Sequence, residues 1–458
     1  MPEEEKVQPQ QKQKAAGEES LLPQEERIFS PVSWLAAWIG SSIFIGVFML
    51  GGSLVPPTGK MNLFQAIICM LVALSIVAVC LMINGRAGNK YGIPFVAQAR
   101  TSFGYKGSIF PMCLRAIPAI CWYGIQSWVG ATALCQVLDI LFGIGTEFPA
   151  QLACFVVFQG IQIWMSAGGF HGIKWIENIG TVVIVVSLIY MLYVLIANFG
   201  DALSAGLINI EGTWGLPFFV GTTVFVGMFT TWMLNASDYT REVVKFEKPK
   251  SRITLIIWLG TVPPVVLMGA IGLMAANITG QWDPVVLFVE TLPNSFVLIV
   301  ALIFIAVAQI TTNVMANVIP PTFVIMELFK LKYKTASVIV GVIALFTFPW
   351  WLSSATGFTM FITFYSAFLG PIFAVMVTDY YFVRKQELDL TTLYNPKGPY
   401  AGVNWCGIAA IIVGAACGFI YTDLGWYISL IPSALTYYLL MKSHVKKGGP
   451  FAADAKMK

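Results

Sequence analysis

Twelve apolar stretches divide most of this 458-residue chain, and each is close to the roughly 20 residues that an α-helix needs to cross a bilayer. Hydrophobic residues make up 57% of the chain and charged residues only 11%, whereas a soluble domain carries roughly 25% charged residues. The loops between the stretches are too short for a soluble domain. The sequence therefore predicts an all-α polytopic membrane protein whose helical bundle performs the function. The expected spans are 33–54, 62–84, 108–141, 149–168, 177–198, 215–236, 253–276, 294–327, 335–353, 356–382, 403–422 and 425–442.

Positive charges follow every second span. Basic clusters occupy 86–106, 241–252, 330–334, 384–397 and 442–447, while the intervening loops carry mainly Asp and Glu. Short cytoplasmic loops carry the Lys/Arg excess, so both termini are expected to be cytoplasmic in a plasma or inner membrane. The net charge of +4 follows from this topology. The bilayer is therefore an expected partner and nucleic acid is not.

Matching interruptions in the first and sixth spans predict an internal repeat. Gly40-Ser41-Ser42 interrupts the first span, and Gly221-Thr222-Thr223 with Gly227 interrupts the sixth. Paired discontinuous helices in two halves are typical of inverted-repeat transporters. Alternatively, these glycines only allow helices to pack closely.

The repeat implies a division of the whole chain. Two five-helix repeats are expected over 29–200 and 201–385, followed by two peripheral transmembrane helices over 386–443. Residues 1–28, rich in Glu, Gln and Lys, predict a disordered cytosolic tail, and 444–458 predict a second tail.

Uncharged polar side chains lie deep in the eighth span. They are Gln309, Thr311, Thr312, Asn313 and Asn317. Hydrocarbon offers no water to such groups, so they must face protein, a wet cavity or a bound solute. This cluster indicates a transport site.

The third span adds an aromatic and amide face. Trp122 and Gln126 stand four residues apart and share one side of a helix, so they can stack a flat ring and hydrogen-bond its edge. Trp128, nearer the helix end, fits either this site or an interfacial belt. Because the deep parts of the spans hold almost no ionisable group, we expect a small, planar, uncharged substrate.

Oxygen atoms near the same level suggest a cation site. The hydroxyls of Thr311 and Thr312, with carbonyls freed near Gly40 and Ile43, form the kind of shell that Na⁺ prefers. Alternatively, the threonine hydroxyls bond to their own preceding helical turn. A proton could also drive uptake, but the absence of a buried Asp, Glu or His relay favours Na⁺.

Several motifs, taken in order, resemble the nucleobase:cation symporter-1 family, which includes cytosine, hydantoin, allantoin and purine permeases. They are Trp38-Ile-Gly40, Gly88-Asn-Lys-Tyr-Gly92-Ile-Pro94, Ala99-Arg100-Thr-Ser-Phe-Gly104, Trp122 with Gln126, Asn235-Ala-Ser-Asp238-Tyr-Thr-Arg241, and Thr311-Thr312-Asn313 with Asn317. The resemblance covers most of residues 30–440. It implies a LeuT-like fold of two inverted five-helix repeats plus two C-terminal helices, working by alternating access.

The resemblance also implies residue roles. Trp122 would stack one face of the substrate, Gln126 would bond its edge, and Asn317 would bond amide-like groups. A Na⁺ site would take Ala308, Thr311 and Thr312 together with the carbonyls of Gly40 and Ile43. No other cofactor is implied.

Two positions depart from parts of the family. Phe229 stands where hydantoin-type members place a second tryptophan, which is closer to the cytosine-permease pattern, and it can still sandwich a ring. Phe44 stands where allantoin-type members show an amide. The loop residues Arg100, Asp238 and Arg241 are expected to hold helix ends rather than to bind substrate.

The leading hypothesis is a Na⁺-coupled symporter that imports a neutral nucleobase, such as cytosine, or a related purine or hydantoin compound. The alternatives are a proton-coupled allantoin or vitamin-precursor permease and a passive facilitator or channel. An enzyme is not expected, because the bundle lacks a paired-carboxylate, metal-ligand or nucleophile–base set. The sequence leaves the oligomeric state open.

Overall fold

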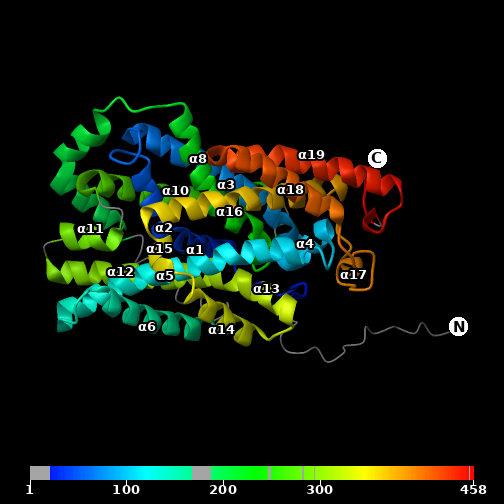
Figure 1. Ribbon diagram of the computed structural model, residues 1–458, viewed down its shortest axis with the longest axis horizontal. Helices are drawn as coiled ribbons and strands as arrows, with labels where there is room; N and C mark the ends of the chain where they lie inside the picture. The colour runs from blue at the N-terminus through cyan, green and yellow to red at the C-terminus, as the bar shows by residue number, and fades with distance from the viewer. Residues whose placement is uncertain are drawn as a thin grey trace.

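The computed structural model describes residues 21–457 except 168–185, 187, 246–248, 281–282, 293 and 453. Within these residues every regular element is a helix, and an isolated β-bridge joins Phe29 to Val243 (Figure 1). Most of the expected N-terminal tail and the first part of the expected fifth span lie outside the described residues.

The first half of the chain forms a series of helices of very different lengths. They are α1 (Pro31–Ser42), α2 (Ile45–Ser53), α3 (Leu63–Tyr91), α4 (Phe95–Phe103), α5 (Ile109–Phe142), α6 (Phe148–Ser166), the helix Leu188–Ile208 that ends in the π-turn η2 (Ser204–Ile208), α8 (Leu216–Leu234) and α9 (Ala236–Thr240).

The second half begins with another long helix and ends with a pair that packs together. Its elements are α10 (Pro249–Thr279), α11 (Pro284–Thr291), α12 (Ser295–Asn313), the π-turn η3 (Val314–Val318), α13 (Ile319–Phe329), α14 (Tyr333–Ala344), α15 (Pro349–Leu352), α16 (Ala355–Thr378), the π-turn η4 (Asp379–Val383), α17 (Leu390–Leu393), α18 (Trp405–Ile420) and α19 (Gly425–Lys446).

Among the described residues, nine helices are long and apolar enough to cross a membrane, and the bent pair α1–α2 makes a tenth. Three shorter apolar helices, Ala316–Phe329, Tyr333–Ala344 and Trp405–Ile420, fall within the remaining expected spans or continue them. Each of the twelve expected spans therefore contains helix. The eighth runs from α12 through η3 into α13, as its length predicted.

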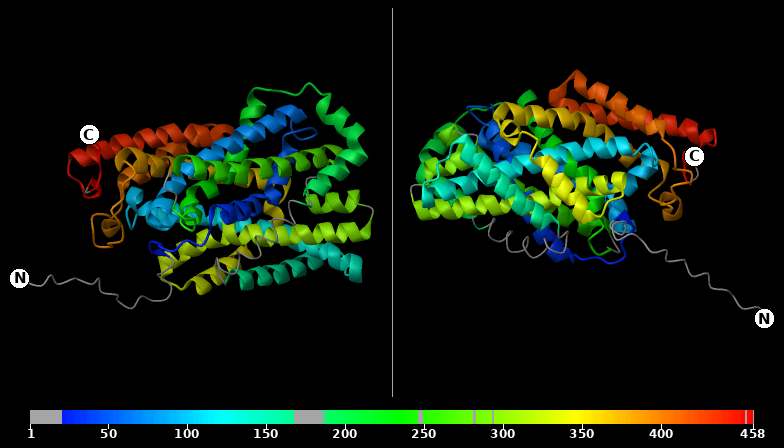
Figure 2. Two further views of the ribbon diagram at one scale, coloured as in Figure 1. Left: turned by 180° about the vertical axis from the view of Figure 1, so that it is seen from behind. Right: turned by 60° about the horizontal axis from the view of Figure 1, so that its bottom comes forward.

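The helices lie roughly side by side, with α1 and α2 in the interior (Figures 1 and 2). Here α5 packs along α12, and α2 packs along α10. One edge is formed by α18 and α19 against α16, and the opposite edge by α6 and α14 (Figure 1). The short helices α4 and α17 and the C-terminal end of α19 lie at the same end of the bundle (Figure 1). The side of the membrane that this end faces stays a prediction.

The expected break within the sixth span is wrong. α8 runs without interruption from Leu216 to Leu234. The hydroxyls of Thr222 and Thr223 donate to the Phe219 carbonyl at 2.8 and 2.7 Å, so both are satisfied inside the helix. A Cβ on Gly221 would meet atoms of neighbouring side chains at 2.9–3.0 Å. Close packing, the alternative interpretation, therefore explains this glycine.

Glycines also bring α2 against α10 at backbone distance. A Cβ on Gly51 would lie 2.1 Å from the carbonyl oxygen of Gly269, and one on Gly272 would lie 2.1 Å from that of Phe48. Both obstacles are main-chain atoms, which cannot swing aside. Small residues of this kind let membrane helices approach closely where no hydrophobic force drives them together. The contact fixes α2, the second half of the broken span.

We predict that Gly272→Ala lowers the unfolding temperature in detergent, because its methyl carbon collides with the Phe48 carbonyl. Overpacking typically costs about 1–3 kcal/mol. Gly160→Ala on α6 is the matched control, since a Cβ there meets nothing within 4 Å. Equal unfolding temperatures for the two variants would contradict the prediction.

Candidate functional site

The first span is broken near its middle, as Gly40-Ser41-Ser42 predicted. α1 ends at Ser42, Ile43 and Phe44 are extended, and α2 continues at an angle of 54°. The Ser41 hydroxyl donates to the Ala37 carbonyl at 2.8 Å, a bond of the kind that bends helices. Carbonyl groups in the last turn of α1 lose the amide partners that a continuing helix would supply. The break therefore places carbonyl groups without helical partners inside the bundle.

Aromatic rings from three helices gather around this break. Phe44 packs edge-to-face against Trp122 of α5, with ring centroids 5.7 Å apart, and against Phe229 of α8 at 5.8 Å. The Phe44 ring thus contacts both rings expected to hold a substrate. Gly46 is required beneath them, because a Cβ there would lie 2.8 Å from the Phe44 ring and 2.9 Å from that of Trp122.

Residues of α16 also contact this cluster of aromatic rings. Phe358 lies edge-on to Trp122 at 5.4 Å, and the Trp122 indole N–H donates to the Tyr365 hydroxyl at 3.3 Å. Tyr365 in turn donates to the Met228 carbonyl at 3.2 Å. These bonds fix the rotamer of Trp122 and join α5, α8 and α16 at one level.

A network of uncharged polar groups lies between α5, α6 and α12. Asn317 donates to the side-chain oxygen of Asn313 at 2.8 Å. The Asn313 amide donates to the Gln162 side-chain oxygen at 3.1 Å, and Gln162 donates to the Ser127 hydroxyl at 2.7 Å. All four side chains are buried. The network satisfies groups that hydrocarbon could not.

The five cation-site candidates lie on two facing segments. Gly40 and Ile43 flank the break, and the threonines and Ala308 belong to α12, which packs against α1. The hydroxyls of Thr311 and Thr312 donate to the Ala308 carbonyl at 3.1 and 2.8 Å. The structure therefore shows the helix-internal bonds of the alternative interpretation. Each hydroxyl oxygen nevertheless keeps lone pairs that can coordinate a cation.

One hydrogen bond connects the candidate cation site with the candidate substrate site. The Thr312 hydroxyl also lies within hydrogen-bonding distance of the Gln126 side-chain oxygen, at 2.9 Å. A hydroxyl has one proton, so it donates a single hydrogen bond to Gln126 or to Ala308, or it shares one bifurcated bond between them. The orientation of the Gln126 amide thus depends on Thr312.

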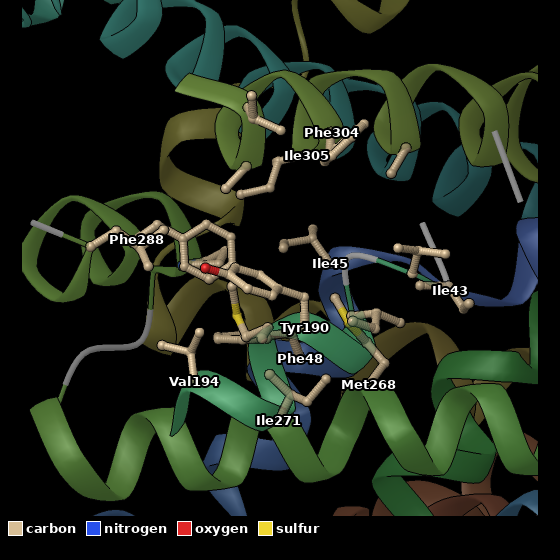
Figure 3. A pocket seen from close by; sticks show the side chains of 18 of the residues that line it. Ile43, Ile45, Phe48, Tyr190, Val194, Met268, Ile271, Phe288, Phe304 and Ile305 are labelled. Atoms are coloured by element: carbon tan, nitrogen blue, oxygen red, sulfur yellow. The ribbon is translucent and has the colours of Figure 1, made fainter. Parts of the chain in front are cut away.

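A cavity of about 330 Å³ opens beside the break, between α2, α10, α11, α12 and the helix Leu188–Ile208 (Figure 3). Its wall is almost wholly apolar and includes Ile43, Phe44 and Ala308. The described lining residues include none of Trp122, Gln126, Phe229 and Asn317. Two of the five cation candidates, Ile43 and Ala308, therefore border this volume, and Phe44 lies between the volume and the aromatic pair.

A charged side chain, that of Arg115, lies on the same helix as Trp122. This arginine is fully buried two turns before Trp122. Its Nε donates to the Thr231 carbonyl at 2.8 Å.

Arg100 of α4, Asp238 of α9 and Arg241 lie at helix ends, and the contacts of Arg100 and Asp238 join neighbouring helices. Asp238 accepts from the Phe95 amide at 2.6 Å, which joins α9 to the start of α4. Arg100 forms an ion pair with Glu327 of α13 at 2.7 Å. Arg241 pairs with the adjacent Glu242 at 3.2 Å.

Sequence reasoning missed two contributors to the site. Gln162 lies among apolar residues of α6, three residues after the equally buried Gln159. Two glutamines within an apolar span could have indicated this buried polar group from the sequence. Tyr365 lies in an aromatic-rich stretch of α16 and gave no such signal, because its partner Trp122 is 243 residues away.

Comparison with known proteins gives consistent relatives. The family described as permeases for cytosine/purines, uracil, thiamine and allantoin matches residues 21–441. The chain is 28% identical to the hydantoin permease of Microbacterium maritypicum over 94% of this chain and 89% of that permease. It is 30% identical to the allantoin permease of Bacillus subtilis (strain 168), over 95% of each.

A solved structure agrees with the sequence relatives. Mhp1, a nucleobase-cation-symport-1 family transporter in a closed conformation with bromovinylhydantoin bound, matches with a TM-score of 0.85 and 28% identity, over 95% of this chain and 97% of Mhp1. The expected LeuT-like all-helical membrane fold is thereby confirmed, and the exact limits of the two repeats stay a prediction. Since the family match spans most of its length, this chain belongs to the nucleobase:cation symporter-1 family of membrane permeases.

Proposed function

We propose that the protein is a secondary active symporter that imports a small, neutral, planar heterocycle together with Na⁺. The observation that carries this proposal is the meeting of Trp122 and Phe229 around the break in the first span, beside an uncharged polar network. Relatives named for hydantoin and allantoin support a heterocyclic substrate. Phe229 favours a nucleobase such as cytosine within that class.

In this proposal Trp122 and Phe229 hold the two faces of the ring, and Phe44 moves aside to admit it. Gln126 and Asn317 bond the ring edge, since an amide both donates and accepts. A neutral substrate fits this environment, because a charged one would need a counter-charge to enter it.

The coupling ion would bind between the break and α12. Its ligands would be the carbonyls of Gly40, Ile43 and Ala308 and the hydroxyls of Thr311 and Thr312, a set of oxygens suited to a hard monovalent cation. Binding there would hold α1 against α12.

The Thr312–Gln126 contact offers a route for coupling. A cation bound to the Thr312 oxygen would polarise its O–H bond, so the hydroxyl would donate more strongly to Gln126. The Gln126 oxygen would then be occupied and its N–H groups directed at the substrate. By linkage, substrate would raise cation affinity by the same factor.

Transport in proteoliposomes tests the proposal. With radiolabelled cytosine, uracil, hypoxanthine, hydantoin and allantoin offered separately, we expect at least one to accumulate under an inward Na⁺ gradient. Replacing Na⁺ by K⁺ should abolish accumulation.

Two outcomes would contradict the coupling. Accumulation under a pH gradient without Na⁺ would identify a proton symporter. Equilibration without accumulation under any gradient would identify a passive facilitator.

We predict that Trp122→Ala weakens substrate binding by about 1–3 kcal/mol, the typical contribution of an aromatic side chain stacked on a base. Binding to the purified protein is measured by calorimetry. Trp128→Ala is the control, because Trp128 is similarly buried on α5 but packs against Phe155 and Trp350. Equal affinity loss in both variants would show that the effect is structural.

We predict that Thr312→Val raises the Na⁺ concentration for half-maximal uptake at least about tenfold, since it removes one oxygen ligand at nearly constant volume. Thr322→Val is matched, because the buried Thr322 hydroxyl donates to the Val318 carbonyl at 2.7 Å on the same continuous helix. An unchanged Na⁺ dependence in Thr312→Val would remove Thr312 from the cation site.

A further inference from the structure

A second cavity, of about 210 Å³, lies beside the C-terminal end of α3. Three cations from two segments line it: Arg86 and Lys90 at the end of α3, and Lys245 in the loop after α9. Tyr380 of η4 and Gln386 belong to its wall as well. Arg86 and Lys90 are four residues apart, so two like charges share one helical face, an unfavourable arrangement without a counter-charge.

Three described carboxylates near the cavity in sequence pair with other cations. Glu242 pairs with Arg241 at 3.2 Å, Asp379 pairs with Arg384 at 2.8 Å, and Glu387 pairs with Lys456. Within the described part of the chain, no ion pair reaches any of the three lining cations. No described carboxylate therefore offsets their positive charge through an ion pair.

The uncharged residue Gln386 occupies the position beside Arg86 and Lys90 where a carboxylate would neutralise them. The Gln386 side-chain oxygen accepts from Arg86 at 3.2 Å, and its main-chain carbonyl accepts from Lys90 at 2.9 Å. These bonds orient the two cations but do not neutralise them. Such a site favours an oxyanion, which accepts several charge-assisted hydrogen bonds at once.

The helices beside the cavity continue into apolar, outward-facing surface. Val79, two turns before Arg86 on α3, is 45% exposed, and Leu255, just after the lining residue Ile253 on α10, is 56% exposed. On α3 the apolar sequence gives way to Asn84 and Arg86 at this level. The cavity thus lies where the hydrocarbon-facing surface meets the polar end of the bundle.

We propose that this cavity binds the phosphate group of an anionic phospholipid, with Arg86, Lys90 and Lys245 contacting the phosphate and the acyl chains lying along α3 and α10. Basic pockets between membrane helices bind anionic headgroups in this way. The bound lipid joins α3, the start of α10 and the segment after α16. This inference is independent of the transported substrate.

Lipid binding by the full-length protein tests the proposal. Dioleoylphosphatidylglycerol is titrated into protein in phosphatidylcholine nanodiscs, and bound lipid is counted by native mass spectrometry. The combined variant Arg86→Gln, Lys90→Gln and Lys245→Gln should bind at least about tenfold more weakly. The control Lys332→Gln, Lys334→Gln and Lys447→Gln removes the same charge from other exposed positions and should change binding by less than about twofold.

Each outcome decides the matter. Equal losses in both triple variants would show nonspecific attraction to basic surface and overturn the site. Equally tight binding of inorganic phosphate would show that free phosphate, not lipid, is the ligand. If the pocket triple variant unfolds in phosphatidylcholine, Lys245→Gln alone replaces it, with an expected loss of about fivefold; unchanged binding there would overturn the proposal.

Discussion

The interruption between α1 and α2 is the constraint on which the rest of the structure depends. A membrane helix satisfies its own backbone, and a break removes that satisfaction for several carbonyl groups. Such groups cannot face hydrocarbon, so the broken segment must be enclosed by other helices. α1 and α2 accordingly lie inside the bundle, packed on α10 and near α12 (Figure 1). Carbonyl groups that lack helical partners make the break costly, and they also make it a place for a polar solute or a cation.

Enclosure of a break requires neighbours that come very close. The Gly51–Gly269 and Phe48–Gly272 contacts bring α2 and α10 to backbone distance, and Gly46 leaves room for the rings of Phe44 and Trp122. On the other side, the Thr312–Gln126 bond joins α12 to α5. Close contacts therefore hold the break on two sides. Any movement of α12 relative to α1 changes the distances between the candidate cation ligands, and it also changes the orientation of Gln126.

Hydropathy predicted the helices well, because the apolar length needed to cross a bilayer is a strong signal. The break at Gly40-Ser41-Ser42 was also predicted correctly, but the similar motif Gly221-Thr222-Thr223 led to a wrong prediction of a second broken helix. Its threonines bond to Phe219 and its glycine faces neighbouring side chains, and only the three-dimensional neighbours distinguish these cases. Pairings across helices, such as Trp122 with Tyr365, depend on the rotation and depth of each helix. A single sequence does not encode those variables in any local pattern.

Phe44 gives the proposed site a physical basis for choosing aromatic solutes. Its ring makes edge-to-face contacts with Trp122 and Phe229, each worth about 0.5–1.5 kcal/mol beyond the area buried. Under the proposed function these contacts are lost when a substrate enters, and only a planar ring with a π-face restores them. A saturated solute of equal size would leave that cost uncompensated. Because displacement of Phe44 lowers apparent affinity for every ligand equally, the contacts regained with Trp122 and Phe229 decide which ligand binds.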